Sequence, residues 1–81
     1  MRIPRDITGH ELMKLLNRKF GYMQTRQVGS HIRITTQQKG EHHVSVPNHK
    51  PIKVGTLNGI INDVAEHFQL SKDLVCTILF E

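Results

Sequence analysis

The fold of this chain is decided by the segment YMQTRQVGSHIRITTQ, which spans residues 22–37. Two runs typical of strands, residues 22–28 and residues 31–37, flank the pair Gly29-Ser30. Glycine followed by a small polar residue suits a type II′ hairpin turn, because glycine tolerates the positive φ of the first central position. The segment therefore predicts an antiparallel hairpin with a two-residue turn.

The predicted hairpin determines which side chains share a face. With a two-residue turn, Val28 lies opposite His31, and Arg26 lies opposite Arg33. Successive side chains of a strand point to opposite faces, so His31 and Arg33 point away from the apolar positions of their own strand. Those apolar positions, which we expect to face the core, are Ile32 and Ile34.

A third strand is predicted at residues 42–46, after a turn at residues 39–41. Its valines alternate with polar residues, so the valines face the core and the polar residues face the opposite side. Pro47 ends the strand because it cannot donate to a ladder. The inward residues are Val44 and Val46, and the outward residues are His43 and Ser45.

Helical patterns flank the strands. Thr8 and Glu11 form a capping box, and Gly21 ends the helix that follows it. A second helix begins near Thr56, and Ser71 caps a third. The apolar stripes of these helices are Leu12, Leu15, Leu16 and Phe20, then Leu57, Ile60, Ile61, Val64 and Phe68, then Leu74, Val75, Ile78 and Leu79.

The order of elements is α-β-β-β-α-α, which predicts an α+β domain with a three-stranded antiparallel sheet. The helices cover one face of the sheet, and polar strand residues line the open face. The 81 residues have room for one core only, so we expect one domain over residues 1–81. A scaffold of this size excludes the barrels and doubly wound sheets of larger enzymes.

The charge of the chain is unevenly distributed. Residues 1–53 carry ten basic and three acidic side chains, a net charge of 10 − 3 = +7, whereas residues 54–81 carry one basic and four acidic, 1 − 4 = −3. This asymmetry favours a polyanionic partner at the cationic end, although ordinary solvated surface charge gives the same pattern. A single cysteine and the absence of any long apolar run indicate a cytoplasmic protein without membrane contact.

Standard motifs for nucleotides, cofactors and metals are absent. The chain has no Walker loop, no dinucleotide fingerprint, no paired cysteines and no H-E-x-x-H. His42 and His43 are adjacent on a strand, so they point to opposite faces and do not easily reach one ion. We therefore expect neither a metal nor another cofactor. Cys76 lies in the apolar third helix and is expected to be a buried residue that packs in the core.

His31 is the best candidate for chemistry because of its predicted surroundings. Arg26 and Arg33 lie directly opposite each other, which is unfavourable unless an anion such as a phosphate lies between them. Histidine titrates near neutral pH and can take a proton from a ribose 2′-hydroxyl or give one to a leaving oxygen. His31 as a mere polar residue of a solvated strand remains an equal alternative at this point.

Three motifs together resemble the HicA toxin family, and the resemblance covers nearly the whole chain. They are Gly29-Ser30-His31, Pro47-Asn48-His49 and Gly55-Thr56-Leu57, in this order and spacing. The resemblance implies a fold similar to a double-stranded-RNA-binding domain. It also implies an mRNA interferase of a type II toxin–antitoxin pair, neutralised by a HicB-type antitoxin and contacting DNA only through the antitoxin complex. The catalytic histidine of the family is the one in G-S-H, which is His31 here.

The second predicted helix departs from the family, because Asn62, Asp63 and Glu66 stand where many relatives carry basic residues. We therefore expect RNA contact from the sheet face and the first helix. The candidates are Lys14, Arg18, Arg26, Ser30, Arg33, His43 and Lys50, with His43 also considered as a second proton-transfer group. The leading hypothesis is metal-free cleavage by transesterification. The alternatives are an RNA-binding module that does not cut and a decayed toxin kept for its antitoxin contact.

Overall fold

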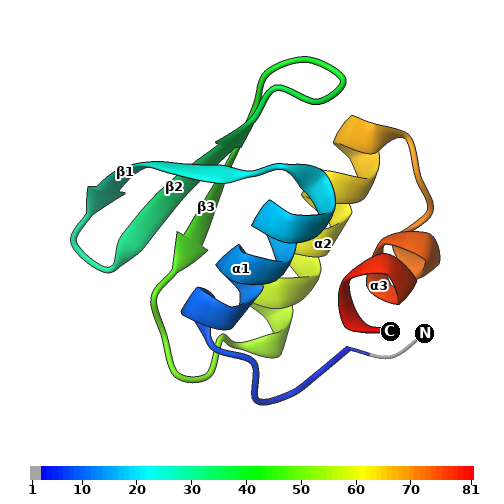
Figure 1. The fold of residues 1–81 in the computed structure, drawn as a ribbon. Coiled ribbons are helices and arrows are strands. Elements are labelled where there is room, and N and C mark those ends of the chain that lie inside the picture. The colour runs from blue at the N-terminus through cyan, green and yellow to red at the C-terminus, as the bar shows by residue number, and fades with distance from the viewer. Residues whose placement is uncertain (1–2) are drawn as a thin grey trace.

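The computed structural model describes residues 3–81 and has the predicted order of elements (Figure 1). The sheet has the strand order β1-β2-β3, and both pairs are antiparallel. This is the expected α+β fold, similar to a double-stranded-RNA-binding domain. The elements are α1 (Gly9–Phe20), β1 (Met23–Val28), β2 (His31–Thr36), β3 (His42–Pro47), α2 (Val54–Phe68) and α3 (Lys72–Phe80).

The β1–β2 hairpin has the predicted register. Val28 pairs with His31 and Arg26 pairs with Arg33, while Gly29 has the positive φ of 59° that the turn requires. Farther from the turn, the register shifts between Gln24 and Arg26, which makes a β-bulge. A bulge bends the strand and increases its twist, so the part of β1 next to the turn is the regular part.

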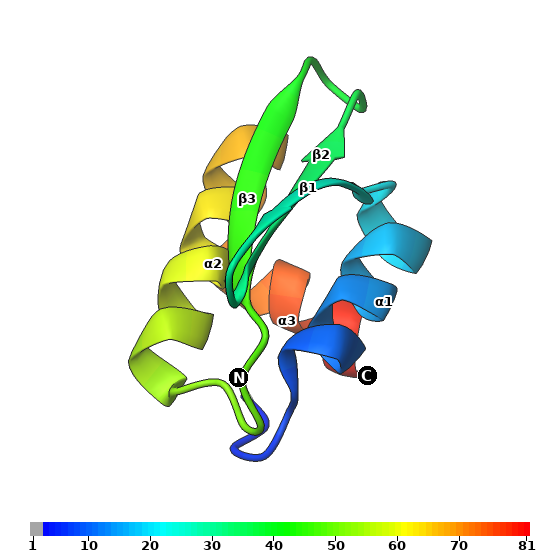
Figure 2. The same ribbon diagram turned by 90° about the vertical axis from the view of Figure 1, so that its left-hand side faces the viewer.

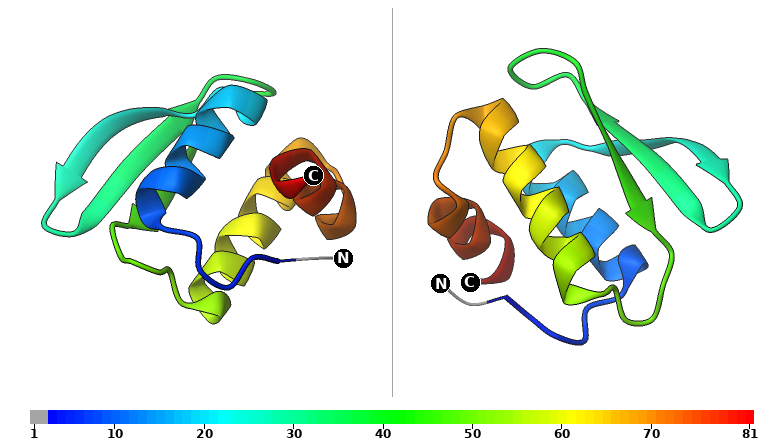
Figure 3. Two further views of the ribbon diagram at one scale, coloured as in Figure 1. Left: turned by 60° about the horizontal axis from the view of Figure 1, so that its bottom comes forward. Right: turned by 180° about the vertical axis from the view of Figure 1, so that it is seen from behind.

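The sheet separates a packed face from an open face. On β2 and β3, isoleucines and valines alternate with polar residues; the apolar set is buried, and Thr36 at the end of β2 is buried with it. The helices cover this buried side: Figure 2 shows α1 and α2 to either side of the strands, with α3 behind. Helix α3 packs against both other helices on the side away from the strands (Figure 3). The buried strand residues are Ile32, Ile34, Thr36, Val44, Val46 and Pro47.

The ends of α1 and α3 have the capping residues that the sequence predicts. Thr8 and Glu11 exchange side-chain and backbone hydrogen bonds of 2.9 and 3.1 Å, which completes the capping box of α1. The bond from the Thr8 backbone N–H lowers the pKa of the Glu11 carboxyl. Gly21 ends α1 in the left-handed conformation, with φ of 75°. The hydroxyl of Ser71 accepts from the Leu74 N–H and caps α3.

Three expectations need correction. Helix α2 begins at Val54, two residues before Thr56, because its first turn is exposed and the apolar stripe does not mark it. Leu74 was grouped with the apolar stripe of α3 but is 44% exposed, since the buried side of this short helix is formed by Val75, Cys76 and Leu79. Pro47 is the last residue of β3 and pairs with His31, so the strand ends at Pro47 rather than before it.

A polar cluster joins β3 to α2 on the packed side of the sheet. The Tyr22 hydroxyl lies 2.7 Å from Nδ1 of His42, and Nε2 of His42 lies 3.2 Å from the Asp63 carboxylate. The His42 ring stacks on His67 with centroids 4.3 Å apart. Burial, with a contribution from Asp63, raises the pKa of Tyr22. The cluster therefore ties Tyr22, β3 and α2 together.

Candidate active site on the open face of the sheet

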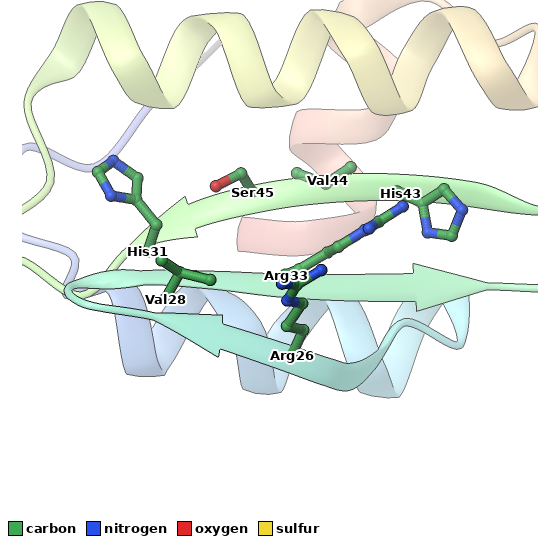
Figure 4. A pocket seen from close by; sticks show the side chains of 7 residues that line it. All are labelled: Arg26, Val28, His31, Arg33, His43, Val44 and Ser45. Carbon is green, nitrogen blue, oxygen red and sulfur yellow. The ribbon is translucent and has the colours of Figure 1, made fainter.

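The open face carries a shallow hollow of about 370 Å³. All three strands contribute to it, and Figure 4 shows its side chains projecting over the face from the turn end of the hairpin to His43, near the start of β3. The alternation of the strands explains this arrangement, because every second residue of β2 and β3 points away from the helices. The lining residues are Arg26, Val28, His31, Arg33, His43, Val44 and Ser45.

His31 lies at the turn end of this hollow with an exposed side chain. Its backbone is held from both sides, since it pairs with Val28 on β1 and Pro47 on β3. The neighbouring turn is also anchored, because the Asn48 N–H donates to the Ser30 carbonyl at 2.6 Å. Within residues 3–81, no hydrogen bond to the His31 ring is recorded. A fixed backbone thus presents an imidazole whose ring nitrogens are open to solvent.

Arg26 and Arg33 occupy the part of the face between His31 and His43 (Figure 4). They are direct cross-strand partners, and both are exposed. The only ion pairs within the described part of the chain are His42–Asp63 and His43–Glu41, so none of its Lys or Arg side chains is paired with a carboxylate. Two unpaired guanidinium groups side by side make this face a place where a phosphate is electrostatically favoured.

His43 differs from His31 because both of its ring nitrogens are engaged. Nδ1 lies 2.8 Å from the Thr35 hydroxyl, and Nε2 lies 2.8 Å from the Glu41 carboxylate. The Thr35 hydroxyl in turn lies 3.0 Å from that of Thr25, which donates to the Arg33 carbonyl at 3.3 Å. This chain of contacts fixes the ring. Proton transfer between His43 and a substrate would require one of these two bonds to break.

The structure brings together only part of the residue set predicted from the sequence. Arg26, His31, Arg33 and His43 line one hollow, and Ser30 forms the turn beside it. Lys50 is exposed in the loop that follows β3, and this loop contacts the turn through Asn48.

Lys14 and Arg18 lie apart from this group, on α1 at the packed side of the sheet. Lys14 lines a different hollow, of about 210 Å³, between α1 and β1.

Val28, Val44 and Ser45 line the hollow but lie outside the set of site residues predicted from the sequence, and Glu41 contacts one of the predicted residues. Ser45 was expected on the open face, but its place opposite Arg33 was not used to include it. Val28 is the partner of His31, and that pairing already predicts a place beside the site. Glu41 lies in the turn before β3, and no local signal in the sequence indicates that its carboxylate contacts the His43 ring.

No candidate metal centre is present among residues 3–81, because no three His, Cys, Asp or Glu side chains converge there. Cys76 is buried, and burial raises the pKa of its thiol, as is typical of a packing residue. The same part of the chain contains no helix that is long and apolar enough to span a membrane. Among the described residues, the open-face hollow is where an exposed histidine and two unpaired arginines lie together.

A family model described as the HicA toxin of bacterial toxin–antitoxin systems matches residues 9–65. The matched range is more than half of the chain and includes every candidate site residue, while α3 lies beyond it. No curated protein and no solved structure gives a significant match. The chain therefore belongs to the HicA toxin family and is the toxin of a toxin–antitoxin pair.

Proposed function

We propose that this HicA-family toxin is an endoribonuclease that cleaves mRNA with His31 as the general acid–base group. The observation that carries the proposal is the exposed, unbonded ring of His31 at one end of a hollow whose middle is occupied by Arg26 and Arg33. A polyanion with a reactive hydroxyl beside each phosphate suits both the free imidazole and the pair of guanidinium groups. Single-stranded or locally structured RNA provides that combination.

The proposed reaction is a transesterification within the RNA. His31 takes the proton of a ribose 2′-hydroxyl, and the 2′-oxygen attacks the adjacent phosphorus. The bond from phosphorus to the 5′-oxygen of the next nucleotide breaks, and that oxygen takes up a proton from His31 or water. The products are a 2′,3′-cyclic phosphate, or its hydrolysis product, and a 5′-hydroxyl.

The two arginines stabilise the charge that develops on the phosphorus oxygens in this scheme. The ladder holds the backbone of Arg26 opposite that of Arg33, so both guanidinium groups can reach the same phosphate on the open face. Positively charged donors beside a developing negative charge lower the barrier of the reaction. His43, fixed by Thr35 and Glu41, is assigned to binding the RNA backbone rather than to proton transfer.

The remaining parts of the proposal concern partners and organisation. A HicB-type antitoxin neutralises the toxin in the cytoplasm, and any contact with DNA is made through the antitoxin complex. Residues 1–81 act as one domain, and the proposed chemistry uses side chains of the chain without a cofactor. Asp63 of α2 is engaged with His42, so this acidic helix is not assigned to RNA.

The test is cleavage of a short RNA by the purified chain in the presence of a chelator, with analysis of the ends. We expect cleavage to persist and to leave 2′,3′-cyclic phosphate or its hydrolysis product. An RNA with a single 2′-deoxy nucleotide at the cleaved position is the matched control and should remain intact at that position. A strict metal requirement, or cleavage of the deoxy control, would contradict the scheme. Retardation of the RNA without any cleavage would instead identify a binding module.

A further inference from the structure

Strand β1 is the least protected part of the sheet. All six of its residues are exposed, and it forms one edge of the strand order β1-β2-β3. The main helix–sheet contacts are made to β3, and within residues 3–81 the β1 backbone bonds only to β2. Figure 3 shows β1 at the side of the sheet away from α2 and α3. Its outer backbone groups are therefore free to pair with another strand.

An apolar groove runs beside this edge. It has a volume of about 210 Å³ between α1 and β1, and Met13, Met23, Tyr22 and Ile34 supply its apolar lining. Met23 is 65% exposed and Val28 is 63% exposed, which makes them the most exposed large apolar side chains of residues 3–81. Met23 lines the groove, whereas Val28 lies at the other end of β1 and lines the hollow on the open face.

The rim of this edge is cationic. Lys14 borders the groove, Arg26 stands on the strand itself, and neither is paired with a carboxylate within the described residues. A second copy of the chain would bring the same cations together, which disfavours pairing of one β1 with another. Charge complementarity favours a partner segment that is acidic and extended, with an apolar side chain for the groove.

We propose that an acidic, extended segment of the antitoxin pairs with β1 as a fourth strand of the sheet. This inference rests on the proposed function, since it concerns the partner that neutralises the toxin. Side chains of an added strand alternate between the two faces of the sheet. Beside residues 26–28, one set lies on the open face next to Arg26 and Val28, and the continuation of the segment past the bulge brings an apolar side chain to the groove at Met13 and Met23.

Strand addition would also explain how binding stops the reaction. An acidic side chain on the open-face side of the added strand reaches Arg26, which lines the hollow that holds His31. This acidic side chain occupies the place of a substrate phosphate and does not contact His31. The bulge at residues 24–26 restricts regular pairing, so the segment next to the turn, residues 26–28, is where the added strand is best accommodated.

The first experiment measures amide hydrogen exchange by NMR. The probe is the protein encoded by the reading frame next to the toxin gene, co-purified with the isotope-labelled toxin. We expect the β1 amides that point away from β2 to exchange quickly in the free toxin and to become protected at least tenfold in the complex. A complex that protects β3 or α2 and leaves these amides unchanged would overturn the inference while leaving the toxin assignment intact.

The second experiment compares two substitutions of exposed apolar residues by glutamate. Met23→Glu places a negative charge in the groove, where it repels the acidic segment of the partner. We expect this variant to bind the neighbouring protein at least tenfold more weakly, while RNA cleavage by the free toxin does not change. Leu74→Glu, on α3 at 44% exposure, is the matched control and should leave the complex unchanged. Equal effects of the two variants, or weaker RNA cleavage with Met23→Glu, would contradict the proposal, the latter because the groove would then hold RNA.

Two further outcomes identify other occupants. If the free toxin is a dimer whose outer β1 amides are already protected, a second copy covers the edge and the inference is wrong. If the neighbouring protein forms no complex with the unaltered toxin, the proposed partner fails, and the inference fails with it. A complex with unprotected β1 amides thus contradicts strand addition alone, whereas the absence of any complex contradicts the proposed partner.

Discussion

His31 and His42 belong to neighbouring strands, yet their surroundings differ completely. His42 lies on the packed side, with Tyr22 at 2.7 Å, Asp63 at 3.2 Å and the His67 ring stacked on it. His31 lies on the open face, and its ring makes no such contact within residues 3–81. A ring whose nitrogens are both engaged contributes to stability, whereas a ring with free nitrogens is available for proton transfer. The comparison therefore separates a structural histidine from a chemical one.

The largest expected effect comes from His31→Ala. Loss of a general acid–base group lowers the cleavage rate by about 100- to 10,000-fold. The free energy of unfolding should change by less than about 0.5 kcal/mol, because an exposed strand position contributes little packing. Cleavage kinetics and urea unfolding of the same preparation check both parts. A variant that unfolds easily, or that still cleaves at the original rate, would remove the distinction between the two histidines.

His42→Ala should show the opposite pattern. Truncation leaves the buried Tyr22 hydroxyl without its partner, which lowers the free energy of unfolding by about 1–3 kcal/mol. Cleavage per folded molecule should remain close to that of the unaltered toxin at a temperature where the variant is still folded. Urea unfolding and cleavage assays, run beside His31→Ala as the matched truncation, test this. Unchanged stability would mean that the Tyr22–His42–Asp63 contacts contribute nothing measurable.

The smallest expected effect is an alkaline loss of stability that depends on Tyr22. Burial raises the pKa of its hydroxyl, so the folded state holds this proton more tightly than the unfolded chain. The contribution to stability is complete below the ordinary tyrosine pKa and decreases as the pH rises above it, by at most about 1.4 kcal/mol per pH unit. Tyr22→Phe should lack this part of the decrease.

Tyr22 is the only tyrosine of the chain, so its ionisation can be followed directly by absorbance. Urea unfolding at a series of alkaline pH values gives the stability of both proteins. Lysines titrate in both and cancel in the difference. An identical alkaline slope in the two proteins would show that Tyr22 is not protected by its burial against His42.

Local physics explains why so much of the hairpin was predictable. The register of Arg26 with Arg33 depends on the length of the Gly29-Ser30 turn, and the exposed face depends on the period of two along β2. Both properties can be read within a short stretch of chain. The helix caps at Thr8 and Ser71 are equally local, and the structure confirms both.

Contacts between elements were not predictable in the same way. The bond from His42 to Asp63 joins residues of β3 and α2, and its formation depends on how that helix packs. The exposure of Leu74 depends on which side of α3 meets the other helices, which a short apolar pattern does not specify. The separation of Lys14 and Arg18 from the open face has the same origin, because α1 packs on the other side of the sheet.

Turn geometry and side-chain alternation act over a few residues, so the order of elements, the hairpin register, the polar open face and the position of His31 beside Arg26 and Arg33 could be read from the sequence. The packing of the helices decided that His42 is engaged by Asp63 and His67, that Lys14 and Arg18 lie apart from the hollow, and that no helix within residues 3–81 covers the edge of β1. Those properties arise when α1, α2 and α3 pack together, and no short segment of the chain contains that information.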